Sequence, residues 1–167
     1  AVKHGDYGFL SLNNSNTLVK VNATDFKFED SLSLPLPRRI VVTSDNHLLV
    51  SCWEAFGANG KLYKIDPTNL SVEASVSLGM LPDYIALDDN NTIYVVNSGD
   101  STVSVVDYTS FQVTNTLEVG HNPSGVAVST TNDVYVLSNG KQAWQGAVTD
   151  ATIHKITNGN VSLEHSW

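Results

Sequence analysis

The stretch Ile93-Tyr-Val-Val-Asn-Ser-Gly-Asp-Ser-Thr-Val-Ser-Val-Val-Asp107 decides the fold of this chain of 167 residues. It consists of two short runs rich in Val, Ile and Tyr, separated by a segment of Asn, Ser, Gly and Asp. Runs of this length with such boundaries are typical of β-strands joined by turns. No window of the chain combines the apolar period of a helix with helix-capping residues. The stretch therefore predicts an all-β protein.

The same pattern occurs four times along the chain. Aligned on Phe9, Leu48, Ile93 and Val134, the first run recurs after 39, 45 and 41 residues. The second run recurs in residues 17–22, 61–66, 102–107 and 152–157. Two further series are a proline-led run in residues 37–42, 82–87 and 123–128, and an outer run in residues 31–34, 74–78, 115–119 and 161–164. Four strands in about forty residues predict a β-propeller blade, with a solenoid of short strands as the structural alternative.

The predicted architecture is a single partial β-propeller domain over residues 1–167. Its four blades of antiparallel strands comprise residues 7–34, 35–79, 80–120 and 121–167. The first recognisable strand, residues 8–13, belongs to the series aligned on Phe9, Leu48, Ile93 and Val134 rather than to the proline-led one. We therefore expect the first blade to lack its inner strand and the chain to hold fifteen strands.

Four blades are about half of a ring, because propellers close with four to eight of them. We expect the chain to be the N-terminal portion of a longer polypeptide, with the remaining blades supplied by that polypeptide or by another chain. A symmetric pair of copies is the less favoured arrangement, since its eight blades would lack two inner strands. Without further blades, apolar faces at both ends would be exposed to water.

Charge and composition exclude several classes of partner. Nine Lys and Arg face seventeen Asp and Glu, a net charge of −8 that argues against nucleic acid and anionic bilayers as partners. No apolar run is long enough to span a membrane, and no charged-then-apolar leader opens the chain. The single cysteine, Cys52, allows no internal disulfide, and the five histidines lack the spacing of zinc ligands. We predict no cofactor and no metal.

Two further segments, together with the stretch quoted first, resemble a known family. The stretch 93–107, followed by Leu117-Glu-Val-Gly-His-Asn-Pro-Ser-Gly-Val-Ala-Val128, resembles the YVTN repeat of YncE-like and lactonase-like β-propellers. The segment Gly60-Lys-Leu-Tyr-Lys-Ile-Asp-Pro67 is similar to surface-layer-type propellers of Bacteroidetes. The resemblance covers nearly the whole chain. It implies a ring of seven blades and an exported bacterial protein, extracellular, at the cell surface or in the periplasm, with a lipid anchor as one means of attachment.

The connections between the second and third strands of each blade differ in length. Corresponding positions on these strands lie 9, 14, 10 and 19 residues apart, so the second and fourth blades carry insertions. Long loops on a rigid scaffold are where binding residues concentrate. The insertions contain Trp53, Glu54 and Phe56, and then Lys141, Gln142, Trp144, Gln145 and Asp150. The connections between blades add Arg38, Arg39, Met80, Asp83, Tyr84, His121 and Asn122 to the same face.

From these loops we predict a ligand-binding surface. Its residues are Trp53, Glu54, Tyr84, Asp83, His121, Trp144, Arg39 and Gln142. Aromatic side chains supply a large contact area there, and the polar residues would orient a ligand through hydrogen bonds. The alternative is that Trp53 and Trp144 only cap the blades by filling gaps between neighbours. The turns on the opposite face are short and alike, and we assign them no function.

Two function classes remain open. The first is a non-catalytic module that binds a small polar ligand or a partner protein; the resemblance implies nutrient capture, for example of corrinoids. The second is a lactonase-like hydrolase, for which the resemblance implies a metal trio that Glu54, Asn97 and Asp83 could form at the channel mouth. The sequence contains none of the common catalytic motifs, and we expect Cys52 to be a buried structural thiol. We therefore favour binding over catalysis.

Overall fold

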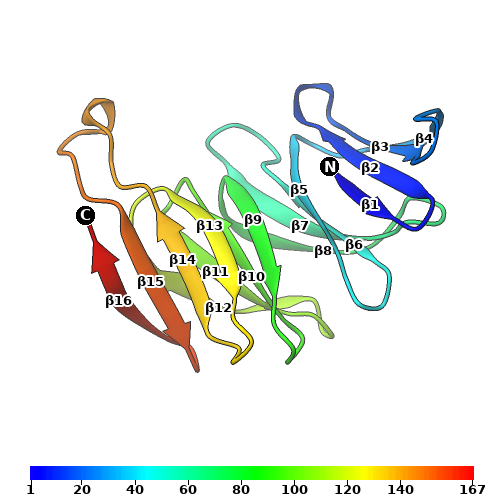
Figure 1. The fold of residues 1–167 in the computed structure, drawn as a ribbon. Coiled ribbons are helices and arrows are strands. Elements are labelled where there is room, and N and C mark those ends of the chain that lie inside the picture. The colour runs from blue at the N-terminus through cyan, green and yellow to red at the C-terminus, as the bar shows by residue number, and fades with distance from the viewer.

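The computed structural model describes residues 1–167 as sixteen strands in four antiparallel sheets of four strands each (Figure 1). The first two sheets comprise β1 (Val2–His4), β2 (Tyr7–Leu12), β3 (Thr17–Asn22) and β4 (Phe28–Ser33), then β5 (Pro37–Val42), β6 (Leu48–Cys52), β7 (Asn59–Asp66) and β8 (Ser71–Met80). The last two comprise β9 (Pro82–Leu87), β10 (Thr92–Asn97), β11 (Thr102–Asp107) and β12 (Gln112–Glu118), then β13 (Pro123–Val128), β14 (Val134–Ser138), β15 (Thr152–Thr157) and β16 (Asn160–Ser166). The prediction of an all-β propeller made of four-stranded blades is confirmed.

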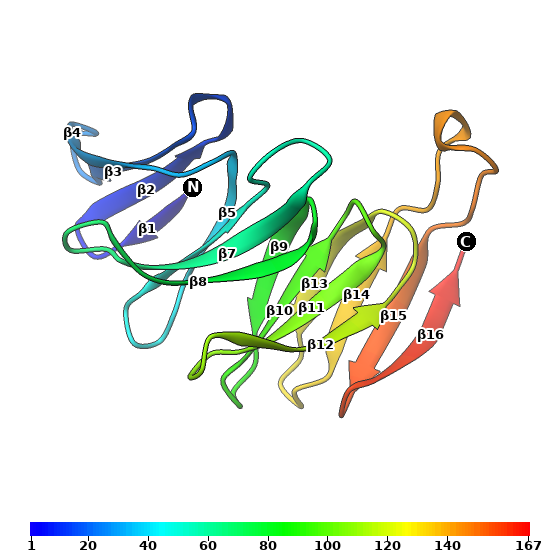
Figure 2. The ribbon, with the colours of Figure 1, turned by 180° about the vertical axis from the view of Figure 1, so that it is seen from behind.

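The four blades form an open row rather than a closed ring. Figures 1 and 2 show the N-terminal and C-terminal sheets at opposite ends of this row. One hydrophobic cluster lies between each pair of neighbouring blades: Phe9 and Leu18 pack with Leu48 in the first, and the other two clusters repeat this arrangement. Each blade is therefore held by its neighbours through apolar surface, as in other repeat proteins.

The inner strands of the last three blades begin in the same way. Each starts at a proline, and Pro37, Pro82 and Pro123 pair with the last residues of the neighbouring strands. Proline is tolerated at the first residue of a strand because its missing N–H disturbs no interior pair of the ladder. The two residues that follow each proline lie at the inner end of their blade, where neighbouring blades meet.

The expectation that the first blade lacks its inner strand is wrong. Residues Val2–His4 form β1, which pairs with β2 through Val2 and Phe9. A strand of three residues without a leading proline is too short to show an alternating pattern, so the sequence did not reveal it. All four blades are therefore complete.

The strand pairings also correct the alignment of the first repeat. Gly8 pairs with Val21 as Leu48 pairs with Ile65, so Gly8 rather than Phe9 corresponds to Leu48. Phe9 instead corresponds to Leu49, and both side chains point toward the next blade. This register decides which side chains of each blade face which neighbour.

The connections divide between the two ends of the blades (Figure 1). At one end, the turns after β5, β9 and β13 place Asn46, Asn91 and Asn132 in the left-handed region, which Asn tolerates well. The longer β6–β7 and β14–β15 loops lie at the other end. Backbone hydrogen bonds tie them to the connections between blades, as from the amide of Gly140 to the carbonyl of His121. The structure has no helix long and apolar enough to cross a membrane.

Candidate functional site

Two arginines hold one carboxylate where the second and third blades meet. Arg38 and Arg39 follow the first residue of β5, and Asp83 follows the first residue of β9. Asp83 Oδ2 accepts a hydrogen bond from Arg38 Nη2 at 2.9 Å, and its Oδ1 accepts one from Arg39 Nε at 2.8 Å. Asp83 is buried, while Arg39 is partly open to solvent. Two guanidinium groups on one carboxylate leave a net positive charge at this position.

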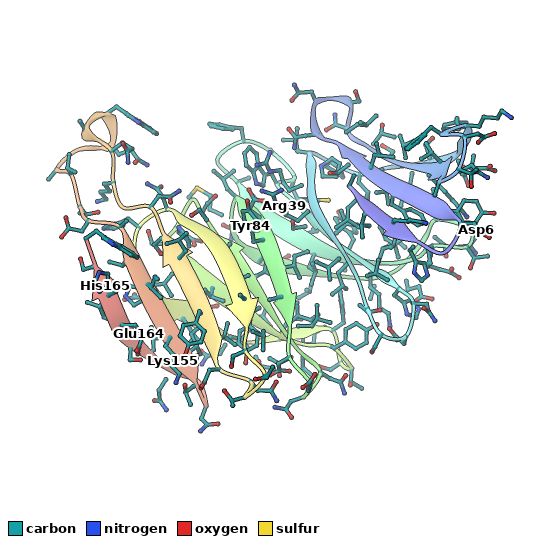
Figure 3. All side chains as sticks on the ribbon, viewed as in Figure 1. Asp6, Arg39, Tyr84, Lys155, Glu164 and His165 are labelled. Atoms are coloured by element: carbon teal, nitrogen blue, oxygen red, sulfur yellow. The ribbon has the colours of Figure 1, made fainter.

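Aromatic rings close this group on both sides. The Arg38 guanidinium carbon lies 4.2 Å from the ring centroid of Trp53, and that of Arg39 lies 3.9 Å from the ring centroid of Tyr84. Such cation–π contacts stabilise the cation and fix the plane of the guanidinium. We call Trp53, Arg38, Asp83, Arg39 and Tyr84 the arginine cluster. Figure 3 shows Arg39 and Tyr84 together at the centre of the row of blades.

Serine side chains fix the backbone beneath the arginine cluster. Ser51 Oγ accepts a hydrogen bond from the Arg39 amide at 3.1 Å and donates one to the Asp83 carbonyl at 2.7 Å. Ser11 Oγ donates in the same way to the Arg38 carbonyl at 2.7 Å. Each serine belongs to the second strand of one blade and reaches the inner strand of the next. The cluster is therefore positioned by the blade packing itself rather than by a flexible loop.

The exposed part of the arginine cluster is Arg39 with Tyr84. Arg39 uses Nε for Asp83, and its two terminal nitrogens make no hydrogen bond within the chain. Tyr84 is 37% exposed, and its hydroxyl group also has no partner in the chain. These groups present a guanidinium fork and a phenol to solvent.

Trp53 occupies the inner side of the arginine cluster. Its indole N–H is buried without a hydrogen-bond partner, and its ring packs against Arg38 and, at 6.2 Å between centroids, edge-on against Phe56. Phe56 itself is 83% exposed. Trp53 thus packs on the Arg38 side of the arginine cluster, while Phe56 is an exposed residue of the β6–β7 loop.

Glu54 is engaged within the second blade. Its Oε1 accepts a hydrogen bond from the Tyr63 hydroxyl at 2.7 Å, and Lys61 Nζ lies 3.4 Å from its Oε2. Burial, together with the Glu54 carboxylate, raises the pKa of Tyr63 above its usual value. The hydroxyl therefore remains a donor at neutral pH. Glu54 anchors the start of its loop and makes no contact with Asp83.

The fourth blade carries a second polar and aromatic surface on its long loop. Trp144 is 83% exposed and lies on a short 3₁₀ turn, Ala143–Gln145. Gln145 Oε1 accepts hydrogen bonds from the Gln142 amide and from Asn122 Nδ2, both at 2.9 Å. An open hollow of about 540 Å³ lies beside this turn, lined by Asn122, Asn139, Gly140, Gln142, Trp144 and Gln145.

His121 lies next to this loop but faces another partner. Its Nδ1 is 3.0 Å from Ser101 Oγ, which belongs to the β10–β11 connection of the third blade. The Gly140 amide bonds to the His121 carbonyl, so the backbone of His121 holds the long loop in place. The imidazole itself does not line the hollow beside Trp144.

The predicted site residues thus fall into separate groups on one end of the blades. Arg39, Asp83, Tyr84 and Trp53 come together in the arginine cluster, whereas Glu54, His121 and the pair Gln142 and Trp144 have local partners of their own. The prediction left Arg38 out of the site and missed Ser51 entirely. The signal that could have included Arg38 is the proline at the start of each inner strand. It places the next two residues of neighbouring blades side by side.

The trio that a lactonase-like site would use is not assembled. Asn97 is fully buried and donates from Nδ2 to Thr102 Oγ1 and Ser104 Oγ, each at 2.9 Å. Glu54 and Asp83 have the different partners described above. No group of three or more His, Cys, Asp and Glu side chains is arranged to hold a metal ion. Cys52 is fully buried, and burial raises the pKa of its thiol, with Glu54 adding to the effect.

The fold is shared with several solved structures. The chain is similar to Kuenenia stuttgartiensis hydrazine synthase, with a TM-score of 0.79 and 17% identity over 96% of this chain and 47% of that chain. It is similar to a Lactobacillus plantarum protein, with a TM-score of 0.71 and 13% identity over 96% of this chain and 54% of that chain. It is also similar to a catalytically inactive virginiamycin B lyase from Staphylococcus aureus with quinupristin, with a TM-score of 0.70 and 13% identity over 93% of this chain and 50% of that chain.

These similarities establish the fold and nothing finer. The chain spans about half the length of the solved structures that it matches. No protein-family model matches the sequence, and no curated protein does so either. Function must therefore be argued from the side chains of this chain.

Proposed function

We propose that this chain belongs to a non-catalytic binding propeller. It takes a small polar ligand, or an acidic segment of a partner protein, on the end that carries the β6–β7 and β14–β15 loops. The observation that carries this proposal is the exposed pair Arg39 and Tyr84, whose guanidinium is stacked and oriented but still has free donors. A guanidinium fork of this kind suits a carboxylate or another planar acceptor, which it can bind through two hydrogen bonds.

The arginine cluster is ordered before any ligand arrives. Asp83 and Tyr84 hold the Arg39 side chain in one place, so binding would require little further loss of side-chain entropy. The loop of the fourth blade adds the exposed Trp144 beside a polar hollow. Aromatic and arginine anchors on a rigid scaffold are the usual centres of binding energy.

The setting of this binding role follows from the family resemblance. We propose export to the bacterial cell surface or the periplasm, where a YVTN-type propeller of the surface-layer kind would capture nutrients such as corrinoids. Further blades, from the same polypeptide or from another chain, would complete the binding surface. Cell fractionation with an antibody against the chain tests the location, and a cytosolic protein would contradict it.

A lactone hydrolase is the second candidate function. The fold similarity to a lyase supports it in general terms, because the same architecture there serves an enzyme. Against it, Glu54, Asn97 and Asp83 are each occupied by separate partners. A hydrolase would have to rearrange all three groups before they could share one substrate.

Calorimetry with defined probes distinguishes the two functions. Cyanocobalamin, sugar acids and the corresponding lactones would be titrated with and without Ca²⁺, and the mixtures analysed for product. We expect saturable binding of at least one probe without turnover, weakened at least about tenfold in Arg39→Gln, which loses one charge-assisted pair. Lys61→Gln is the matched control. It removes an exposed cation at the same end of the blades, where Lys61 pairs with Glu54. Turnover of a lactone that is lost in Asp83→Asn would instead establish the hydrolase.

A further inference from the structure

The β14–β15 loop, residues 139–151, borders a hollow that differs in character from the arginine cluster. Figure 1 shows this loop standing out beyond the ends of the strands. The hollow has a volume of about 540 Å³, which lies in the range typical of small-molecule sites. It is lined by Gly140, Trp144 and four amide residues, Asn122, Asn139, Gln142 and Gln145. None of these residues ionises, so the hollow offers no charge partner to an acid or to an amine.

The floor of the hollow is polar at a position that is apolar in the neighbouring blades. Leu36, Leu81 and Asn122 each precede the proline of an inner strand, and their φ values are 44°, 53° and 52°. The carbonyl of each accepts a hydrogen bond from the amide of the residue that follows the second strand of its blade. The three positions are therefore equivalent, and only Asn122 has a side chain that can form hydrogen bonds.

The loop is held in one shape by that asparagine. Asn122 Nδ2 donates to the Gly140 carbonyl at 2.6 Å and to Gln145 Oε1 at 2.9 Å. Gln145 Nε2 donates back to Asn122 Oδ1 at 3.1 Å, and Gln145 Oε1 also accepts the Gln142 amide. A loop that is ordered before the ligand arrives loses little entropy on binding.

Three side chains at the hollow are left for a ligand. Asn139 and Gln142 are exposed, and the contacts that hold the loop use the Asn139 backbone and the Gln142 side-chain oxygen. The Asn139 amide group and Gln142 Nε2 are therefore free, and a side-chain amide offers two donors and an acceptor. Trp144 adds an indole that is 83% exposed. The hollow thus combines an aromatic face with amide donors and an amide acceptor.

This combination suits a neutral ring that carries several hydroxyl groups. A hydroxyl both donates and accepts, so it matches a side-chain amide, and the C–H bonds on one side of a pyranose ring form an apolar face that packs on an indole. A carboxylate or phosphate would find no cation in the lining. A wholly apolar ligand would leave the amides without partners, which costs free energy.

We propose that the hollow beside Trp144 binds a neutral pyranose sugar, stacked on the indole and bonded through its hydroxyls to Asn139 and Gln142. The sugar is either free or the terminal unit of a glycan, since the hollow is open on one side. The inference rests on the binding role proposed above and adds to it a second subsite, separate from Arg39.

Calorimetry with uncharged sugars tests the proposal. The probes are the methyl glycosides of glucose, galactose, mannose and N-acetylglucosamine, together with a trisaccharide of each. We expect saturable binding of at least one probe, weakened roughly thirtyfold in Trp144→Ala and about fivefold in Asn139→Ala. Tighter binding of a trisaccharide than of its methyl glycoside would identify a glycan as the source, and equal binding would identify a single sugar.

Phe56→Ala is the matched control for Trp144→Ala. Phe56 is also 83% exposed and lies on the other long loop at the same end of the blades, but it does not line the hollow. Its substitution should leave sugar binding unchanged, and thermal unfolding confirms that each variant is folded. Absence of binding across the whole panel, or equal weakening by Phe56→Ala, would overturn the proposal.

Salt separates this inference from the proposed function on which it rests. NaCl at about 0.5 M screens charged contacts, so sugar binding should persist while binding of an acidic probe to Arg39 weakens. Acid binding without any sugar binding would refute the sugar site and leave the proposed function standing. Sugar binding without acid binding would support the sugar site and contradict the role of Arg39. A sugar affinity that falls as salt rises would overturn the proposal.

Discussion

Asp83 determines which parts of its two arginines remain available. It occupies Nε of Arg39 and one terminal nitrogen of Arg38, and the aromatic rings of Tyr84 and Trp53 cover one side of each guanidinium. Arg39 is the more exposed of the two, with 45% of its side chain open to solvent against 30% for Arg38, so it presents more of its unpaired donors. Arg38 helps to join the second and third blades through Asp83, and Arg39 is the residue to which the proposed ligand would bind.

Trp144 provides the sharpest test of a single residue. Trp144→Ala should weaken probe binding roughly thirtyfold if the indole is a binding anchor, because anchors of this type contribute about 2 kcal/mol or more. The melting temperature should hardly change, since the side chain is exposed and removes no buried contact. Calorimetry and thermal unfolding of the same variant measure both quantities. Unfolding with unchanged affinity would identify Trp144 as a structural cap.

Asp45 gives the protein a defined dependence on acid. Burial acts to raise the pKa of Asp45, but hydrogen bonds from Thr43 and Tyr108, together with His47, lower it well below its ordinary value of 3.8. A group with a lowered pKa in the folded state stabilises that state above the ordinary pKa and loses this effect as the pH falls. Urea unfolding from pH 6 to pH 2 should therefore show a loss of stability below about pH 4 that is smaller in Asp45→Asn. The exposed Glu29→Gln should leave the acid dependence unchanged, and an equally steep loss in Asp45→Asn would refute the assignment.

At the scale of the elements, the sequence predicted the twelve strands of the last three blades well. The alternation of apolar and polar residues in these strands, and the proline and asparagine residues at their boundaries, can be recognised within short windows of the sequence. β1 was missed because three residues cannot show a pattern. The contacts of the arginine cluster were not predictable in detail, since they join Arg38 and Arg39 to Asp83 across 45 and 44 positions through the packing of two blades. Leu70 and Phe111, in the turns after β7 and β11, pack in clusters with residues of the preceding blade, and the sequence pattern showed neither contact.

The turns between third and fourth strands offer a matched pair of substitutions. Phe111→Ala should cost about 3–5 kcal/mol of unfolding free energy, because it leaves a cavity in the cluster with Leu49 and Leu62. Phe26→Ala should cost far less, because Phe26 stands at the equivalent turn position, with φ of 58° against 53° for Phe111, but is 77% exposed. Urea unfolding followed by circular dichroism compares the two. Equal costs would show that the turn conformation, rather than burial against the preceding blade, determines the contribution of the side chain.

At the scale of the whole molecule, packing and binding use different parts of the blade. The three apolar clusters lie between blades and repeat with little change, while insertions occur only in loops at one end. Loop length and loop sequence can therefore vary without disturbing the contacts that hold neighbouring blades. The same separation explains why fold similarity to proteins of different activity says little about the ligand of this chain.

The proline that begins the inner strand in each of the last three blades is followed by two positions whose residues differ from blade to blade. The two residues after it are Arg38 and Arg39 in the second blade, Asp83 and Tyr84 in the third, and Ser124 and Gly125 in the fourth. A side chain added at Gly125 would meet only ordinary contact with Leu137, so the fourth blade has room for a larger residue there. In the binding role proposed above, specificity would rest on these two residues per blade, held on a constant frame of strands. Exchanging these pairs while leaving the strands as they are would then change the ligand preference without disturbing the packing between blades.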